Sequence, residues 1–488
     1  MFIQSNIQFQ FLKMAEKQSK PSHAIVIPLP YQGIINPFVN FALKIASKGF
    51  TVTFVQLEFI HHRLSKAHND STAHVDLFSG ARESGLDIRC VTISDGFPLD
   101  FDRDQDFNIY WDFLVRDFPA RVDECIGNVI KNDTNSAYFL VSEPLSAWLV
   151  TVAEKYKLVN VLFSTMAASV FSLTYHLDLL RENGHLHSKD TKDVEIDYIP
   201  GVKPINTTDL MPYLDEDHIL FESIYTAFKD AKKADFILHN TVQELEPETL
   251  SSLNNLYQPN YAIGPAIFFE STIHSSFWPK SDCASWLASK PAGSVLYISF
   301  GSLVQISKHV IEELAHGLLL SGVNFLWVVR EGVIGSSDEA TSVLPVGFES
   351  EIEEGKGLIV PWCDQISVLS SLSVGGFLTH CGWNSIVESM WCGVPMICYP
   401  VAYDQPTNRK LVVDDWKIGV DLCDQGMLVD RNAIDERIKS FMSGEMGKVL
   451  REEAKKVKEK FRNALSNGGS SEENFDRFIS DLKEKLAW

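Results

Sequence analysis

The sequence predicts an α/β protein built from two doubly wound domains that face each other across a cleft. Short apolar runs alternate with helical patterns in both halves of the chain, the arrangement that produces parallel sheets covered by helices. Each half also opens on a buried strand that ends in a small-residue turn before a helix, at residues 23–33 and 294–302. The length of 488 residues suits two or three domains. We therefore expect ligands in the cleft, at the carboxyl ends of the strands.

In the first half, the predicted elements follow one another with the spacing of βαβ units. A helix from Pro37 to about Lys48 connects a first strand, His23–Leu29, to a second, Thr51–Gln56. Further strands are predicted at residues 86–93, 138–141, 159–163 and 235–239, and further helices from about residue 108 and at 146–156, 168–183 and 219–232. The strand at 235–239 is expected to be the last of this half.

The second half repeats the alternation. Its strands are predicted at residues 294–300, 324–329, 358–360, 375–379 and 395–399, and its helices from about residue 307, from 385 to about 391, within 430–465 and at 471–486. We divide the chain into an extension at 1–22 that is expected to be disordered, with Met14 as an alternative start, a first domain at 23–253, a Pro- and Ser-rich linker at 254–290, a second domain at 291–470 and a last helix at 471–488.

Composition excludes several classes of partner. The formal net charge of −21 argues against binding to nucleic acid or to an anionic membrane, so an anionic ligand must be held by local donors. No apolar run approaches the roughly 20 residues of a membrane span. The eight cysteines are scattered without a CxxC pair and mostly lie in apolar runs, which predicts reduced cysteines in a cytoplasmic protein. We expect a monomer.

One stretch, from Trp362 to Gln405, carries most of the predicted chemistry. A buried strand at 375–379 ends in His-Cys-Gly-Trp-Asn-Ser and is followed by a helix, so free backbone N–H groups face an anion such as a diphosphate. Asn384 and Ser385 are residue types that cap helices and could add donors. Glu388, one turn further, can accept hydrogen bonds from ribose hydroxyls, and Asp404-Gln405 can read a polyol. Together with the flat face of Trp362, these groups predict a nucleotide-sugar site.

This 44-residue stretch resembles the signature box of the plant family-1 UDP-glycosyltransferases, from W..Q through HCGWNS, E and GVP to DQ. The opening WCDQ resembles that of group 86, and HNTVQELE at 239–246 resembles another family segment. The resemblance implies the GT-B arrangement of two Rossmann-like domains, with the last helix packed back on the first. It implies UDP-sugar, with glucose as the usual sugar, as co-substrate, a small-molecule acceptor, and no metal or other cofactor.

The resemblance also assigns roles to residues of the second half. It gives base stacking to Trp362, uracil contacts to Gln365 and the backbone of Cys363, and ribose to Glu388. Its diphosphate contacts are Ser302, His380, Asn384 and Ser385. The sugar hydroxyls go to Trp383, Asp404 and Gln405, and Thr165 in the first half contacts the donor. Taken alone, His380 would more often be a buried core histidine.

The catalytic positions depart from the family pattern. The loop that usually carries a histidine reads Gly33-Ile34-Ile35-Asn36-Pro37, so Ile34 stands where the general base is expected, and Glu143 replaces the usual aspartate. Isoleucine has no titratable atom and cannot deprotonate an acceptor hydroxyl. Three interpretations remain open: transfer that uses Glu143, a nearby histidine or an already ionised acid acceptor; a repurposed enzyme that catalyses cyclisation, isomerisation or elimination; and a non-catalytic ligand-binding protein.

Two further clusters have weaker interpretations. The acidic residues Asp102, Asp104 and Asp106 could hold a metal, although a solvated loop before a helix fits the pattern better. Aromatic residues of the first half could line an apolar acceptor pocket for an aromatic or terpenoid substrate, although each alone is a common core residue: Phe97, Trp111, Phe118, Tyr175 and Tyr213. The sequence leaves the acceptor and its reacting position open.

Overall fold

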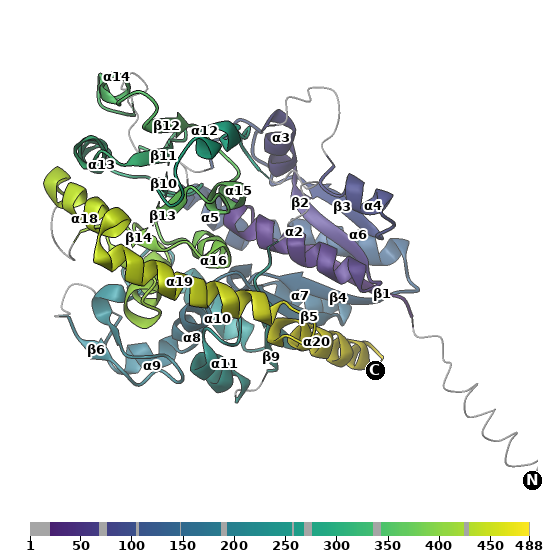
Figure 1. Ribbon diagram of the computed structural model, residues 1–488. Coiled ribbons are helices and arrows are strands. Elements are labelled where there is room, and N and C mark those ends of the chain that lie inside the picture. The colour runs from purple at the N-terminus through teal and green to yellow at the C-terminus, as the bar shows by residue number, and fades with distance from the viewer. Residues whose placement is uncertain are drawn as a thin grey trace, which may run out of the picture.

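A computed structural model describes most of the chain. The described residues are 20–67, 76–103, 107–146, 148–186, 193–255, 258–267, 276–334, 343–423 and 429–487. Most of the predicted N-terminal extension lies outside these ranges. In Figure 1 the C-terminal helices, coloured yellow-green to yellow, run diagonally across the molecule from the second half to the first.

The first half forms a parallel sheet that contains seven of the described strands. Its order is β3-β2-β1-β4-β5-β8-β9. In chain order these strands are β1 (Ser22–Ile27), β2 (Thr51–Leu57), β3 (Ile88–Ile93), β4 (Ala137–Ser142), β5 (Val159–Ser164), β8 (Phe236–His239) and β9 (Asn260–Ala262). A two-stranded antiparallel hairpin, β6 (Glu195–Ile196) with β7 (Ile205–Asn206), stands apart from the sheet.

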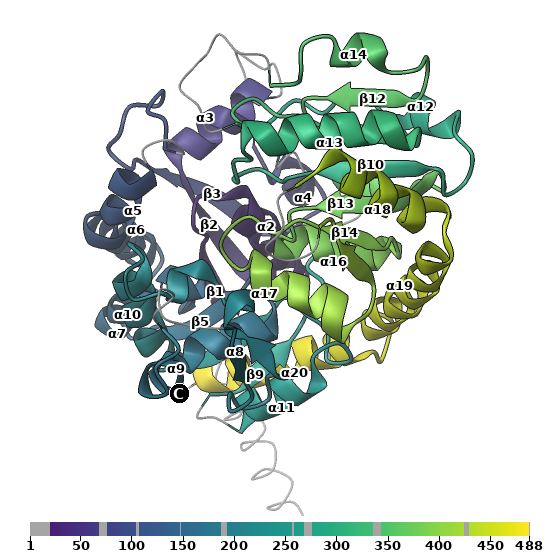
Figure 2. The same ribbon diagram turned by 90° about the vertical axis from the view of Figure 1, so that its left-hand side faces the viewer.

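Helices cover both faces of this sheet (Figure 2). The α-helices are α2 (Gln32–Ser47), α3 (Glu58–Ala67), α4 (Ser79–Glu83), α5 (Phe107–Arg116), α6 (Phe118–Asn132), α7 (Leu149–Tyr156), α8 (Ala168–Tyr175), α9 (Leu177–Glu182), α10 (Phe221–Ala231) and α11 (Pro247–Asn254). Short 3₁₀ turns occur at η1 (Pro144–Ser146), η2 (Thr207–Asp209) and η3 (Pro212–Leu214).

The second half forms another parallel sheet, with six of the described strands in the order β12-β11-β10-β13-β14-β15. These are β10 (Val295–Ser299), β11 (Asn324–Val328), β12 (Gly357–Val360), β13 (Val374–Thr379), β14 (Met396–Cys398) and β15 (Gly419–Asp421). The helices are α12 (Ala284–Ala288), α13 (Lys308–Ser321), α14 (Phe348–Glu351), α15 (Gln365–Leu369), α16 (Trp383–Cys392), α17 (Gln405–Lys410), the π-helical η4 (Leu411–Asp415), α18 (Arg431–Ser443), α19 (Glu445–Ala464) and α20 (Ser470–Leu486). The two sheets confirm the predicted α/β class.

The strand orders place the site. In the first sheet, β1 pairs on one side with β2 and on the other with β4, so the connections after β1 and β4 leave in opposite directions. In the second sheet, β10 pairs in the same way with β11 and β13. Such switch points open a crevice at the carboxyl ends of the strands. Predicted residues flank both switch points. In the first sheet, Ile34 follows β1 and Glu143 follows β4; in the second, Ser302 follows β10 and His380 follows β13.

Several predicted boundaries are wrong. The helix α2 begins at Gln32 rather than at Pro37, so Ile34 lies on its first turn, and Pro37 lies inside the helix. The predicted helix 168–183 divides at His176 into α8 and α9. The first sheet also continues past residue 239, because β9 pairs with β8 inside the segment predicted as linker. Strand β9 has only three residues, too few for a periodic pattern.

The last helix, α20, lies against the first domain (Figure 1). Ser471 is fully buried and donates a hydrogen bond of 2.6 Å to the carbonyl of Gly264. Lys44 on α2 forms an ion pair of 2.6 Å with Glu472, and Tyr261 on β9 donates to Asp481. The C-terminal helix therefore ties the second domain to the first.

The segment HNTVQELE has a structural role in this fold. Glu246 is buried and accepts hydrogen bonds from the backbone N–H groups of Ala168 and Ser169, at 3.1 and 2.8 Å, and from the hydroxyl of Thr241 at 2.7 Å. It satisfies the first turn of α8, whose own N-cap, Ala167, has no side-chain oxygen.

We predict that Glu246→Gln destabilises the protein. The amide keeps the volume but replaces an oxygen that receives hydrogen bonds with an N–H₂ group that faces other donors. The loss should be about 2 kcal/mol of unfolding free energy, measured by urea denaturation. Glu248→Gln, an exposed neighbour on the same helix, is the control and should change little; equal effects of both variants would contradict the assigned role.

Candidate functional site

The N-terminus of α16 forms a shelf of backbone donors. Strand β13 ends at Thr379, Cys381 adopts a left-handed conformation with φ of +66°, and the helix starts at Trp383 with Gly382 as its N-cap. The prediction that Asn384 and Ser385 are cap residues is therefore wrong: they are the second and third helical residues. The first-turn N–H groups still lack helical acceptors, so the shelf suits an anion as predicted.

His380 stands beside this shelf, between two glycines. A Cβ atom added at Gly301 would lie 2.5 Å from Cε1 of His380, and one added at Gly382 would lie 2.5 Å from its Nε2. Burial, together with the charge of Arg330, lowers the pKa of His380 to about 4. The imidazole is therefore neutral at pH 7 and can offer a neutral N–H to a phosphate oxygen, without adding positive charge.

Arg330, which the sequence analysis missed, shapes the other side of the shelf. It follows β11, and its buried guanidinium donates to the carbonyl of Gly301 at 3.0 Å and to that of Val304. These bonds hold the loop that carries the predicted diphosphate residue Ser302. Arg330 lies at the end of FLWVVR, where a cation after an apolar strand could have been noticed.

A hydrogen-bonded chain joins the predicted nucleoside residues. Gln365 donates from Nε2 to the hydroxyl of Ser385 at 3.0 Å and to Oε2 of Glu388 at 2.8 Å. Its Oε1 accepts from the hydroxyl of Tyr297 at 3.1 Å, and this hydroxyl also lies 3.6 Å from Sγ of the buried Cys363. Burial raises the pKa of Glu388 to about 7. The structure thus brings together the start of the signature stretch, assigned to uracil, and Glu388 within it, assigned to ribose.

Trp362 has an aromatic partner that sequence reasoning did not find. Trp278, from the segment that connects the domains, stacks on it with ring centroids 4.5 Å apart and planes inclined by 30°. The indole of Trp362 is therefore backed on one face and can stack with a base on the other. Trp278 lies in a segment with few periodic signals, so its position gave no sequence cue.

The predicted sugar-reading residues begin α17. Gln405 accepts at Oε1 from the backbone N–H groups of Val401 and Ala402, at 2.8 and 2.9 Å, which leaves its amide nitrogen as the group for a sugar hydroxyl. Asn408 donates to Asp404 at 2.8 Å and to the carbonyl of Cys381 at 3.0 Å. Asn408 therefore couples the sugar end of the site to the diphosphate shelf.

Two side chains of α16 reach the first domain instead of solvent. The indole N–H of Trp383 donates to the carbonyl of Asn240 at 2.9 Å, and Nδ2 of Asn384 donates to the carbonyl of Gly33 at 2.5 Å. The side-chain N–H of Trp383 is thus engaged, and its backbone N–H is the group that can face a sugar. The helix end predicted to bind the donor consequently lies against the first turn of α2, which carries Ile34.

Across this boundary, Glu143 lies directly after β4. Its side chain is 1% exposed and accepts a hydrogen bond of 2.6 Å from the N–H of Leu145. Burial, opposed by that hydrogen bond and reinforced by the negative charge of Asp404, raises the pKa of Glu143 to about 8. The pKa of Asp404 is itself raised to about 6 by burial. The cleft therefore holds one carboxyl from each domain within electrostatic range of the other.

The remaining predicted residues separate into two groups. Tyr213 is buried near both carboxyls, whose charges, after burial itself, hold the pKa of its hydroxyl far above the usual range. Thr165 is buried directly after β5, at the same sheet edge. Three of the other proposed acceptor-pocket aromatics are buried in the hydrophobic core, and Phe97 is partly buried against it: Trp111, Phe118 and Tyr175 are the buried ones. Tyr175, for example, donates to Gln258 at 3.2 Å.

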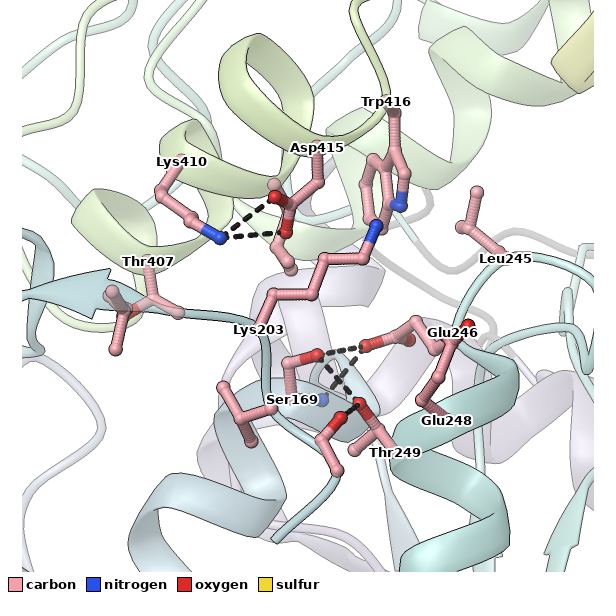
Figure 3. A pocket seen from close by; sticks show the side chains of 14 residues that line it. Ser169, Lys203, Leu245, Glu246, Glu248, Thr249, Thr407, Lys410, Asp415 and Trp416 are labelled. Carbon is pink, nitrogen blue, oxygen red and sulfur yellow. Dashed lines mark hydrogen bonds and ion pairs between the residues drawn. The ribbon is translucent and has the colours of Figure 1, made fainter. Parts of the chain in front are cut away.

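A separate cavity lies between the domains, away from these residues (Figure 3). Its lining includes Ser169, Glu246, Lys203 and Trp416. Lys410 and Asp415, which also line it, pair with each other at 2.8 Å. None of the predicted donor residues lines it, and Glu246 already accepts from Ser169 and Thr241, so we assign it no ligand.

The described residues can be searched for metal sites, disulfides and membrane-spanning helices. In the described ranges, no group of three or more His, Cys, Asp or Glu side chains is arranged to hold a metal. Asp104 and Asp106 of the acidic cluster lie outside those ranges. No disulfide joins the eight cysteines, all of which are described. No described helix combines the length and apolar character needed to cross a membrane.

Comparisons with known proteins agree with this geometry. The model of the family "UDP-glucoronosyl and UDP-glucosyl transferase" matches residues 217–440. The chain is 46% identical to UDP-glycosyltransferase 86A1 of Arabidopsis thaliana over 97% of both chains. It is also similar to Phytolacca americana UGT2 complexed with UDP-2fluoro-glucose and pterostilbene, with a TM-score of 0.76, 26% identity, and 95% of this chain and 99% of that one covered.

A further structure, Medicago truncatula UGT71G1 complexed with UDP-glucose, has a TM-score of 0.79 and 25% identity, and covers 95% of this chain and 98% of its own. These neighbours confirm the GT-B arrangement that the resemblance implied.

We predict that Gly301→Ala weakens UDP binding by about tenfold or more, because the new Cβ would displace the imidazole of His380 from the shelf. Isothermal titration calorimetry with UDP measures this loss. Gly293→Ala is the matched control, since its φ of +66° is close to the +70° of Gly301 but a Cβ there meets nothing within 4 Å. Equal losses in both variants would attribute the effect to backbone strain alone.

Proposed function

The chain belongs to the plant family-1 UDP-glycosyltransferases, within group 86, and we propose that it transfers glucose from UDP-glucose to a hydroxyl of a small plant metabolite, with Glu143 as general base. The observation that carries the choice of base is the buried carboxyl of Glu143 at the β1–β4 switch point, close to Asp404 of the sugar-reading segment. The neighbour solved with UDP-2fluoro-glucose and pterostilbene supports a donor and an acceptor of these classes.

The donor side supports this proposal residue by residue. The shelf at α16, with His380, Ser302 and Ser385, offers neutral donors to the diphosphate, which suits a chain whose net charge of −21 supplies no general attraction for anions. Trp362, Gln365 and Glu388 form one connected wall for uridine. Asp404 and the amide of Gln405 stand at the sugar end.

Glu143 meets the requirements of a base better than any other residue of the proposed acceptor side. Its pKa of about 8 lies close to the operating pH, where general-base catalysis is most effective. Compared with the usual aspartate it has one more methylene group, so its carboxylate can lie further from the backbone. Ile34, on the first turn of α2, is partly buried and packs against the core of the first domain, so it adds an apolar wall there.

The proposed step is a single displacement. The carboxylate of Glu143 takes the proton of the acceptor hydroxyl as its oxygen forms a bond to C1 of glucose. The bond between C1 and the diphosphate oxygen breaks, and UDP leaves with the electron pair, stabilised by the shelf. Attack opposite the leaving group inverts the configuration at C1. Neither a metal nor another cofactor is required, and we propose that the protein acts as a cytoplasmic monomer.

The electrostatics of the cleft favour a neutral hydroxyl acceptor over an ionised acid. Burial raises the pKa values of Glu143 and Asp404, and the charge of Asp404 raises that of Glu143 further, so their site disfavours negative charge. A carboxylate acceptor would add a third acidic group. This argument selects among the three chemical routes that the sequence left open for transfer.

The direct test is to incubate the purified protein with UDP-glucose and a panel of phenols, terpenoid alcohols and carboxylic acids. We expect acceptor-dependent release of UDP and a mass gain of one hexose on hydroxyl acceptors. UDP-glucose binding without release, or a modified acceptor without a hexose, would reject the proposal in favour of a repurposed or non-catalytic protein.

We predict that the pH dependence of kcat/KM identifies the base. A base acts only when deprotonated, so the rate should rise with pH through an apparent pKa near 8. Glu143→Gln should lower kcat by about 100-fold or more and remove this rise, with little change in UDP affinity. A variant that keeps the same pH profile would exclude Glu143 as the base.

We predict that Ile34→His restores the usual dyad and increases transfer. A histidine on the first turn of α2 would stand near the carboxyl of Glu143, which can orient it, and the Ile34→His, Glu143→Asp double variant reproduces both usual identities. The double variant should exceed the parent in kcat at pH 7. No gain in either variant would mean that the acceptor side differs by more than the missing base.

A further inference from the structure

The first turn of α16 has a second task besides the donor shelf. Its two leading side chains, Trp383 and Asn384, both donate to backbone carbonyls of the first domain, those of Asn240 and Gly33. These carbonyls follow β8 and β1, two strands of the first sheet. The carbonyl of Asn240 is buried and needs a donor, which Trp383 of the second domain supplies, whereas Gly33 is exposed.

The acceptor at Gly33 is available because of Pro37. In a helix, the N–H of residue 37 would donate to the carbonyl of residue 33, but proline has no N–H. Pro37 lies inside α2, so the carbonyl of Gly33 has no such intrahelical donor, and Nδ2 of Asn384 reaches it from the other domain at 2.5 Å. The opening of α2 is therefore built to receive this contact.

A neighbouring helix makes matching contacts. On α17, the hydroxyl of Thr407 donates to the carbonyl of Asp209 at 2.7 Å, and the buried Arg409 pairs with the carboxylate of Asp209 at 3.4 Å. Asn408 links α17 to the loop before α16. The two helices that carry the diphosphate and sugar residues are consequently fixed to the first domain as one unit.

We propose that Trp383 is a positioning residue, whose indole N–H aligns the donor helix with the acceptor domain. The inference rests on the proposed transfer reaction. It separates alignment from nucleotide binding, because the uridine wall of Trp362, Gln365 and Glu388 makes no use of these interdomain contacts. Loss of the indole N–H should misplace the glucose relative to the acceptor while UDP still binds.

The test replaces the indole with a ring of similar character. Trp383→Phe should lower kcat for transfer by about tenfold, keep the Kd for UDP within about twofold, and raise the ratio of UDP-glucose hydrolysis to transfer. Trp391→Phe is the matched control: this buried tryptophan lies on the last turn of α16, at the opposite end of the helix from Trp383, and packs under Arg462 of α19. It should leave the hydrolysis ratio unchanged.

Thr407→Val provides a second variant should Trp383→Phe fold poorly, because it removes only the hydroxyl that donates to Asp209. It should show the same pattern of lower kcat, unchanged UDP affinity and increased hydrolysis. If the parent protein transfers glucose and both variants match the Trp391→Phe control, the positioning role is wrong.

Hydrogen exchange separates this inference from the proposed function. If the parent transfers no sugar, the proposed function fails, and the exchange of segments 32–36 and 240–242 then decides the inference alone. Faster exchange of both segments in Trp383→Phe, but not in Trp391→Phe, supports the interdomain contact. Unchanged exchange in both variants overturns it.

Discussion

The structure depends on one constraint: an acidic chain has to hold a diphosphate without a basic surface. The proposed solution is the set of backbone N–H groups at the start of α16, where Cys381 is left-handed and Gly382 is the N-cap. Gly301 and Gly382 belong to the same arrangement, because a side chain at either position would clash with the neutral imidazole of His380 beside the shelf. Arg330 supports the shelf by binding loop carbonyls.

The acceptor side has a different electrostatic requirement, which concerns the pKa of the group that deprotonates the acceptor. A group that removes a proton near neutral pH must have a pKa near that pH, and a solvated glutamate does not. The structure raises the pKa of Glu143 by burying it and by placing Asp404 nearby. The same burial makes the cleft unfavourable for further negative charge. The proposed base and the proposed preference for a neutral acceptor thus rest on one arrangement.

Sequence patterns predicted the fold class and most strands, because these depend on local periodicity and on motifs of fixed spacing. They failed where distant contacts decide the outcome. The start of α2 was missed because proline is typical of the first turn of a helix, whereas Pro37 lies inside this one. The carbonyl of Gly33, one turn before Pro37, accepts a hydrogen bond from Asn384 instead. Strand β9 was missed because its three residues gain their order from pairing with β8.

Contacts between separate segments were also invisible in the sequence. Trp278 gave no signal because the indole it stacks on, that of Trp362, lies more than 80 residues away in the sequence. The same limit applied to Trp383, which the resemblance assigned to sugar hydroxyls but whose indole N–H binds Asn240. A residue-by-residue transfer of roles describes what a motif touches in the ligand. It does not describe what the same motif touches in the rest of its own chain.

These interdomain contacts explain why the signature stretch can serve both halves of the molecule. A transferase of this architecture must bring an atom held by one domain to an atom held by the other, and an error of about 1 Å can cost about 100-fold in rate. Contacts made far from the donor would transmit small rotations of a domain to the reacting atoms. Trp383, Asn384 and Thr407 lie on the helices that carry the donor residues, so the alignment is fixed where the reaction requires it.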